Sequence, residues 1–330
     1  MKTVSKLLGV ATLMAFCSSL NASSLATTEH KNTHVITVDV KRPKLDYIRH
    51  LVYSQPPVYG FENKPLEMEI MKPEKLESST KPLPTVLFVP GGAFASANMS
   101  RNFQLKVDLA EAGYAVASIE YRVVPQAIFP SPLEDVKSAV RFLRANAKRF
   151  DIDSNNIAIM GSSAGGYFAA MAGVTNGMKE FEQGENLDQS SDVKAVVDLF
   201  GASDLTKLDF GAPEKFKALH HDSSSPESIL VNGMALIQRT HGGILTNPER
   251  AAKANPITYI SDKTPPFLVM VGDADNRVPA NQSELLHDAL MNKGVNSTFY
   301  ILKGAKHGDT PWEQEAVSKI IIDFLGKHLK

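Results

Sequence analysis

The sequence predicts an α/β protein with a mostly parallel central sheet, helices on both faces of that sheet and a small cap insertion. From residue 85 onward, short apolar runs follow one another, and stretches with helical spacing separate most of them. This alternation is typical of strand-helix-strand units around a buried parallel sheet. One run also ends in a Gly-x-Ser-x-Gly turn that leads into an alanine-rich helical segment. The expected strands are TVLFVP (85–90), YAVASIEY (114–121), NIAIMG (156–161), VKAVVDLFG (193–201), PFLVMVGD (266–273) and STFYILKG (297–304).

Residues 1–26 are typical of a secretory signal peptide. Lys2 and Lys6 precede the apolar run LLGVATLMAF, and small residues follow it up to an expected cleavage after Ala22 or Ala26. The apolar run is about half of the roughly 20 residues that a membrane-spanning helix needs. We therefore expect a secreted or periplasmic protein with no stable membrane insertion after cleavage.

The single cysteine, Cys17, lies inside this segment. Phe16 precedes it where lipid-modification signals place a small residue, so lipoprotein anchoring is a secondary alternative. Residues 27–330 are expected to form one catalytic domain with neither a disulfide nor a thiol nucleophile. The chain has 35 basic and 36 acidic residues and no block rich in lysine or arginine, which argues against a nucleic-acid partner.

Two segments before residue 85 alternate apolar and polar side chains. They are VITVDV (35–40) and PLEMEIMK (65–72). A period of two residues is typical of strands with one face exposed. We expect both to be half-exposed antiparallel strands at an edge of the sheet.

A helix is expected after the sequence IFP. Ser131 suits the N-cap, Pro132 the first helical position, and Glu134 would complete a capping box. Helical spacing places a set of apolar residues on the face that would cover the sheet: Val136, Ala139, Val140, Leu143 and Ala147.

The alternation of strands and helices stops between residues 205 and 259, where Gly, Ser and Pro interrupt an irregular stretch. We interpret this stretch as a cap inserted over the carboxyl edge of the sheet. His220, His221 and Asp222 invite a metal-site interpretation, but they have no regular spacing, so a polar cap surface is expected instead. At the other end of the chain, Trp312 and the run AVSKIIIDFLGKHL predict a final amphipathic helix that packs on the sheet.

The segment NIAIMGSSAGGYFAAMAG (156–173) contains the candidate nucleophile. A strand, the turn GSSAGG and a helix follow one another, which places Ser163 on a sharp turn at the carboxyl edge of the sheet. Gly161 and Gly165 carry no side chains that could collide across this turn. The helix that starts after Ser163 presents free amides that favour negative charge.

A serine hydroxyl needs a base to accept its proton and a carboxylate to orient that base. A sharp strand-to-helix turn that carries the nucleophile is called a nucleophile elbow. With such an elbow, the acid and the histidine are expected to follow the serine in that order along the chain. Asp273 and Asp275 lie just past one predicted strand, and His307 lies just past the next. We choose Asp275 as the acid because it is better placed to project from the loop, with Asp273 as the fallback that caps loop amides.

Backbone donors for the developing oxyanion are expected in the sequence VLFVPGGAF. A buried strand runs directly into Gly91 and Gly92, which allow the backbone to approach a ligand closely. The amides of Gly92 and Ala93, together with that of Ala164 after the nucleophile, would form the oxyanion hole.

These residues resemble the α/β-hydrolase superfamily, in particular its esterase and lipase branch related to hormone-sensitive lipase and the bacterial feruloyl-esterase-like enzymes. The resemblance runs from about Pro65 to the C-terminus. It includes EYRVVPQAIFPSPLEDVKSAVRFLRANAKRFDIDSNNIAIMGSSAGG, SPESILVNG and VGDADNRVPANQSELLHDALMNKG. It implies the α/β-hydrolase fold, a triad of Ser163, Asp275 and His307, no metal and no organic cofactor.

One departure from that branch concerns the oxyanion loop. The branch usually carries His-Gly-Gly-Gly, whereas Pro90 replaces the histidine here and Ala93 replaces the third glycine. A similar PGG form occurs among relatives that remove acetyl groups from sugars, so the resemblance implies that a carbohydrate ester is a plausible substrate.

The sequence therefore predicts a serine carboxylic ester hydrolase that forms an acyl-enzyme on a small-molecule ester. The expected substrates are short-chain, acetylated-sugar or small aromatic acyl esters. An apolar cluster in the insert would wall a small acyl pocket: Ile229, Leu230, Val231, Met234, Leu236 and Ile237. Two alternatives are a peptidase of the prolyl-oligopeptidase type and a catalytically inactive binding protein on the same scaffold. The sequence does not indicate an oligomeric state.

Overall fold

The computed structural model describes residues 32, 34–58, 63–74, 81–210 and 214–329. The chain divides into two units, residues 1–41 and residues 42–330. The described part of the first unit contains no helix or strand, so the strand expected at 35–40 is wrong. An alternating pattern gives a strand only where a neighbouring strand supplies side-chain and hydrogen-bond partners. The predicted signal peptide and Cys17 lie outside the described residues.

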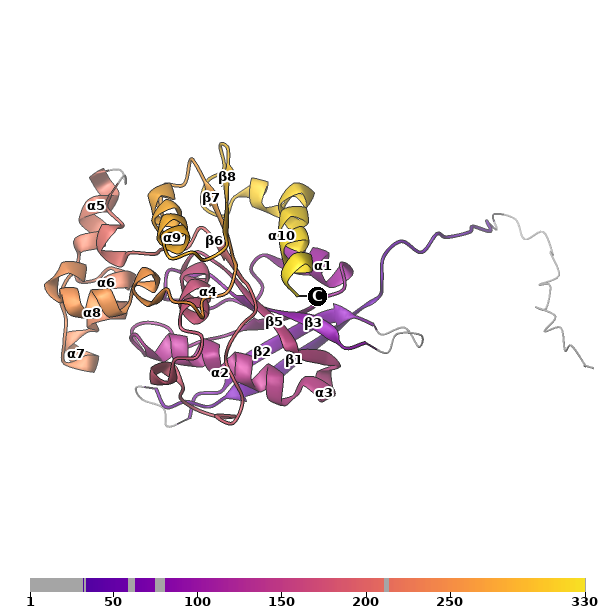
Figure 1. The fold of residues 1–330 in the computed structure, drawn as a ribbon, viewed down its shortest axis with the longest axis horizontal. Helices are drawn as coiled ribbons and strands as arrows, with labels where there is room; N and C mark the ends of the chain where they lie inside the picture. Colours follow the sequence, from indigo (N-terminus) through magenta and orange to yellow (C-terminus); the bar gives the residue numbers. More distant parts are fainter. Residues whose placement is uncertain (1–31, 33, 59–62, 75–80, 211–213, 330) are drawn as a thin grey trace, which may run out of the picture. The chain divides into compact units, whose positions relative to one another are not determined.

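The second unit contains an eight-stranded sheet in the order β1, β2, β4, β3, β5, β6, β7, β8 (Figure 1). β1 pairs antiparallel with β2 and β2 with β4, whereas the other neighbours pair in parallel. All of the strands expected from residue 85 onward are confirmed. The strands are β1 (Leu45–Ser54), β2 (Leu66–Pro73), β3 (Leu83–Val89), β4 (Ala115–Ile119), β5 (Ile152–Ser162), β6 (Val196–Leu199), β7 (Phe267–Gly272) and β8 (Ser297–Leu302).

The two edges of the sheet differ from the expectation. β2 is an inner strand and is mostly buried, while β1, which the alternation did not indicate, forms the edge beside it. β8 forms the other edge, and Tyr300 and Ile301 are exposed although this strand was expected to be buried. An apolar run alone does not distinguish an inner parallel strand from an edge strand that is covered on one face.

Helices cover both faces of the sheet (Figure 1). On one face, α1 (Phe103–Glu111) and α10 (Glu315–His328) share an apolar core with Trp312 in the short helix η5 (Thr310–Glu313), as the sequence predicted for the final helix. The opposite face carries α2 (Ser131–Ala145), α3 (Ala147–Phe150), α4 (Ala164–Val174) and α9 (Ala280–Asn292). No helix in the described ranges has both the length and the apolar character needed to cross a bilayer.

The start of α2 differs from the predicted capping box. Pro130 occupies the N-cap position, Ser131 is already helical, and no side chain caps the helix. The predicted apolar face is buried as far as Leu143, whereas Ala147 belongs to α3. With Pro130 at the cap, the helix starts one residue earlier than the capping-box pattern indicates.

Between β6 and β7 the chain forms a series of short helices where the sequence suggested irregular structure. Side chains cap three of them, since Asp204 accepts from the Thr206 amide, Ser225 from the Ser228 amide and Asn247 from the Arg250 amide. The helices are η2 (Leu205–Lys207), α5 (Glu214–His221), α6 (Pro226–Asn232), α7 (Ala235–Gln238), η3 (Ile244–Thr246), α8 (Pro248–Lys253) and η4 (Pro256–Tyr259). In Figure 1, α5 to α8 gather on one side of α4 and α9.

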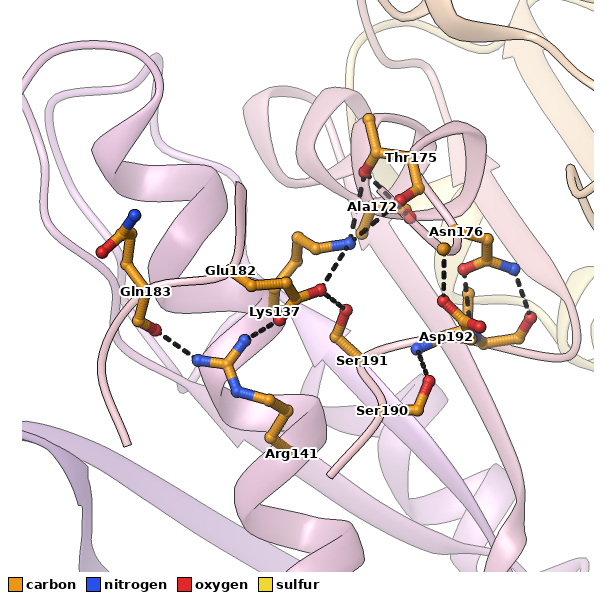
Figure 2. Close-up of polar contacts among 12 residues, drawn as sticks. Lys137, Arg141, Ala172, Thr175, Asn176, Glu182, Gln183, Ser190, Ser191 and Asp192 are labelled. Carbon is orange, nitrogen blue, oxygen red and sulfur yellow. Dashed lines mark hydrogen bonds and ion pairs between the residues drawn. The ribbon is translucent and has the colours of Figure 1, made fainter. Parts of the chain in front are cut away.

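Buried charges tie α2 to the segment between α4 and β6, which includes the short helix η1 (Lys179–Phe181) (Figure 2). Lys137 Nζ donates to the Thr175 carbonyl at 3.1 Å and pairs with Glu182 at 3.3 Å. Arg141 pairs with the same carboxylate and donates to the Gln183 carbonyl. Each of these two buried cations therefore has partners in the segment, and the contacts join the segment to α2.

Candidate active site

Ser163 occupies the turn between β5 and α4 in the conformation that its sequence motif predicts. Its backbone has φ 56° and ψ −124°, a strained combination for a residue with a side chain. Its amide donates to the Leu199 carbonyl at 2.8 Å. A Cβ on Gly161 would lie 2.1 Å from the Gly165 carbonyl oxygen, and one on Gly165 would lie 2.0 Å from that of Val89. Glycine is therefore required on both sides of the serine.

The side chains of Ser163, His307 and Asp275 lie in one hydrogen-bonded row. His307 Nε2 is 2.8 Å from Ser163 Oγ, and Nδ1 is 2.7 Å from Asp275 Oδ2. The Asp275 carboxylate is fully buried, and its other oxygen accepts the amides of Arg277 at 2.8 Å and Val278 at 3.1 Å. The loops after β7 and β8 thus bring the acid and the base to the serine from neighbouring parallel strands.

Asp273, the fallback acid, lies elsewhere in the same loop. It is exposed, and its Oδ1 accepts the Gly304 amide at 2.5 Å. It therefore joins the loops after β7 and β8 through a backbone contact, and Asp275 is the carboxylate beside His307.

The loop after β3 faces the same cavity as Ser163. Gly92, Ala93 and Ala164 all line this cavity. Ala93 has φ 50°, in the left-handed region. Within the described part of the chain, the amides of these three residues have no protein acceptor. Free amides at the cavity are what an oxyanion hole requires, and their role as its donors stays a prediction. A Cβ on Gly91 would lie 2.5 Å from the Ser162 carbonyl oxygen, so this loop packs directly against the elbow.

Tyr121 is hydrogen-bonded to the loop after β3. Its hydroxyl donates to the Pro90 carbonyl at 2.9 Å, and the residue is 1% exposed. Burial raises the pKa of Tyr121, so the hydroxyl stays a donor. The sequence analysis missed this residue. It follows β4, and only the pairing of β3 with β4 brings it beside Pro90.

The cavity has a volume of about 850 Å³, within the range of small-molecule sites. The predicted apolar cluster of the insert does not wall it. Leu230 and Val231 are buried in the core, and Leu236 is exposed. A different set of residues from the insert lines the cavity, and five of the nine are polar: Leu208, Phe216, Leu219, His220, Asp222, Ser224, Ser225, Pro226 and Glu227.

The two adjacent histidines of the insert have separate partners. His220 Nδ1 bonds to Glu227 on the cavity wall, and the His220 side chain is 15% exposed. His221 Nε2 bonds to Asp209 at 2.9 Å. Among the described residues, no group of three or more His, Cys, Asp or Glu side chains could hold a metal ion.

The BD-FAE family model matches residues 68–290, which is more than half of the chain. The chain belongs to the BD-FAE family. The BD-FAE match includes Ser163 and Asp275 and ends before His307. The eight-stranded sheet with helices on both faces is the α/β-hydrolase fold, as the sequence predicted.

Two curated relatives are esterases. An esterase of Mycobacterium tuberculosis, LipC, is 31% identical over 264 residues, which cover 79% of this chain and 60% of the relative. The isoprenylcysteine alpha-carbonyl methylesterase ICME of Arabidopsis thaliana is 28% identical over 227 residues, covering 68% of this chain and 50% of the relative. The chain thus spans about half to three fifths of these relatives' length.

A solved structure matches almost over its whole length. It is a truncated form of a carbohydrate esterase from gut microbiota, with 30% sequence identity and a TM-score of 0.72. The match covers 87% of this chain and 99% of that one.

Proposed function

We propose that this protein is a serine carboxylic ester hydrolase that works through an acyl-enzyme. The observation that carries the proposal is the hydrogen-bonded row of Ser163, His307 and Asp275. The similarity of this chain to two esterases, LipC and ICME, supports the same reaction class.

In the first half-reaction, Ser163 Oγ attacks the ester carbonyl carbon and His307 Nε2 accepts the hydroxyl proton. Asp275 stabilises the resulting imidazolium and holds its Nδ1–H. The carbonyl oxygen becomes an oxyanion, which the free amides of Gly92 and Ala164 are available to stabilise, with Ala93 beside them. When the tetrahedral intermediate collapses, the carbon–oxygen bond to the alcohol breaks and His307 gives its proton to the leaving oxygen.

The second half-reaction reverses these roles with water as the nucleophile. His307 removes a proton from water, the hydroxide attacks the acyl carbon, and a second oxyanion forms at the same amides. Collapse breaks the bond to Ser163 Oγ, which recovers its proton from His307. The net reaction converts ester and water into acid and alcohol without a metal or an organic cofactor.

We further propose that the alcohol part of the substrate is a carbohydrate and that the acyl group is short, with acetyl as the preferred one. The polar wall from Asp222 to Glu227 supports a hydroxyl-rich alcohol, because a sugar can replace the water that these side chains would otherwise bind. The structural similarity to a carbohydrate esterase supports the same substrate class.

Active-site labelling and substrate comparison test this proposal. A fluorophosphonate should add to Ser163 of the wild type, as located by peptide mass spectrometry, and should not add to Ser163→Ala. The labelled enzyme should lose hydrolysis of acetylated xylose and of p-nitrophenyl acetate together. Absence of labelling and of ester hydrolysis would leave the inactive binding protein, while faster cleavage of matched amides than esters would indicate the peptidase.

We also propose that residues 1–26 are removed on secretion. Expression of the full chain in a Gram-negative host should yield periplasmic protein whose N-terminus follows Ala22 or Ala26, as read by N-terminal sequencing. An intact N-terminus in cytoplasmic protein would contradict this, and a lipid on Cys17 in the membrane fraction would favour the lipoprotein.

A further inference from the structure

Phe200 follows β6 at the wall of the cavity and is 3% exposed. Its φ of 47° lies in the left-handed region, where a bulky residue costs on the order of 1–3 kcal/mol unless its surroundings impose the conformation. The surroundings do so here. The Phe200 amide donates to the Met270 carbonyl at 2.8 Å, and the Gly201 amide donates to Asp198 Oδ1 at 2.9 Å.

This left-handed turn brings the Phe200 ring against two other rings. Its centroid is 4.8 Å from that of His307 with an interplanar angle of 64°, and 4.5 Å from that of Trp312 with an angle of 66°. Both are edge-to-face contacts, which aromatic rings prefer. Trp312 is itself fixed, because its Nε1–H donates to the carbonyl of Lys306, the residue before the histidine, at 2.8 Å.

The hydrogen bonds of His307 leave one motion of its ring unrestricted. Nδ1 and Nε2 each have one partner, Asp275 and Ser163, and the imidazole can still tilt about the line through these contacts. A tilt turns the nitrogen lone pair and the N–H bond away from their partners, which weakens hydrogen bonds steeply. The Phe200 ring lies against the imidazole, where a tilt would bring the two rings into collision.

We propose that Phe200 is a positioning residue that sets the plane of the His307 ring for proton transfer from Ser163. This inference rests on the proposed function, because it assigns His307 the role of base. The same turn also fixes the nucleophile, since the residue before Phe200, Leu199, accepts the Ser163 amide at 2.8 Å. One short segment after β6 therefore orients both partners of the proton transfer.

The test compares Phe200→Leu with Phe181→Leu as a matched control. Phe181 is 1% exposed and also makes edge contacts with two rings, those of Phe129 and Tyr259, outside the cavity lining. Both changes should lower thermal stability to a similar extent. Only Phe200→Leu should lower kcat, by about 10-fold to 100-fold with KM changed less than about threefold, as expected for a misplaced base.

Proton NMR gives a readout that does not depend on turnover. The wild type and Phe181→Leu should show a far-downfield resonance from the His307 Nδ1 proton bonded to Asp275, absent in His307→Ala. In Phe200→Leu this resonance should be broadened or lost. If Phe200→Leu does not fold, Phe200→Met, which also removes the ring, replaces it.

The outcomes separate the two proposals. Full kcat and an unchanged downfield resonance in folded Phe200→Leu would overturn the positioning role while leaving the esterase proposal intact. A wild type that neither labels nor hydrolyses esters would overturn the function, and the resonance would still decide whether Phe200 holds the ring.

Discussion

At the scale of single residues, the side chains of the hydrogen-bonded row should act as a unit. Ser163→Ala and His307→Ala are each expected to lower kcat on p-nitrophenyl acetate by about 10⁴-fold to 10⁶-fold, and Asp275→Asn somewhat less. The double variant that combines Ser163→Ala with His307→Ala should have a kcat no lower than that of the slower single variant. The matched control is Asp273→Asn, since this carboxylate accepts the Gly304 amide and has no other hydrogen-bond partner among the described residues. Normal kcat in Ser163→Ala together with loss in Ser162→Ala would refute the elbow assignment.

Asp198 should make stability depend on pH. Burial raises its pKa from 3.8 to about 7 against the hydrogen bond from the Gly201 amide. A raised carboxyl pKa means that the folded state binds the proton more tightly than the unfolded state. This group's stabilising contribution is therefore complete at low pH and is lost as the pH rises from about 4 to about 7.

Asp198→Asn should remove this dependence and keep an acceptor for the Gly201 amide. The free energy of unfolding, from urea denaturation at several pH values, should fall in the wild type relative to the variant by a few kcal/mol between these limits. The contributions of the other titrating groups to the free energy of unfolding cancel when the variant is subtracted from the wild type. A difference that stays constant with pH would show that Asp198 does not titrate in this range.

At the scale of elements, the loop after β3 should tolerate no side chain at Gly92. A Cβ there would lie 2.1 Å from the Ser96 carbonyl oxygen, so the loop itself must shift and turn its amides. Gly92→Val is expected to lower kcat about 100-fold, roughly 3 kcal/mol, as loss of one oxyanion donor does. Thermal unfolding confirms that the variant is folded. If a folded variant keeps its turnover, the oxyanion donors lie elsewhere.

The hydrogen bond between Tyr121 and Pro90, which the pairing of β3 with β4 makes possible, should contribute measurably to stability and to kcat. Tyr121→Phe removes one buried hydrogen bond and is expected to cost about 1–3 kcal/mol of stability and lower kcat about tenfold. Tyr167→Phe is the matched control, because its equally buried hydroxyl donates to the Ala254 carbonyl, away from the oxyanion loop. Equal losses of kcat in both variants would indicate general destabilisation instead of loop support.

At the scale of the whole molecule, the polar wall of the cavity sets the expected substrate range. Each buried methylene contributes about 0.8 kcal/mol only where an apolar wall receives it. Along a p-nitrophenyl ester series from acetate to palmitate, kcat/KM should therefore be highest between acetate and butyrate. A maximum at decanoate or beyond would contradict the short-acyl proposal and indicate a lipase.

The parts of this molecule differ in how far the sequence predicts them. The turn at Ser163 has a local signal. Asp275 and His307 came into consideration through their order in the chain and their positions just past two successive predicted strands. The structure places all three side chains together, and their catalytic roles stay predictions. Tyr121 and Phe200 act through contacts between distant segments, so no local spacing reveals them. The prediction of the residues that wall the cavity was wrong for the same reason. The packing of the short helices, and not the apolarity of their sequences, decides which side chains face the cavity.

The position of His307 behind β8 has a consequence for the timing of synthesis. β8 follows all the other described strands in the sequence and forms an edge of the sheet, so a nascent polypeptide can pair those strands before His307 is present. Until the segment that carries His307 leaves the ribosome, Ser163 lacks the proton acceptor that the proposed mechanism assigns to it. Under the proposed mechanism, a nascent chain therefore cannot hydrolyse cellular esters while β1 to β7 are being synthesised.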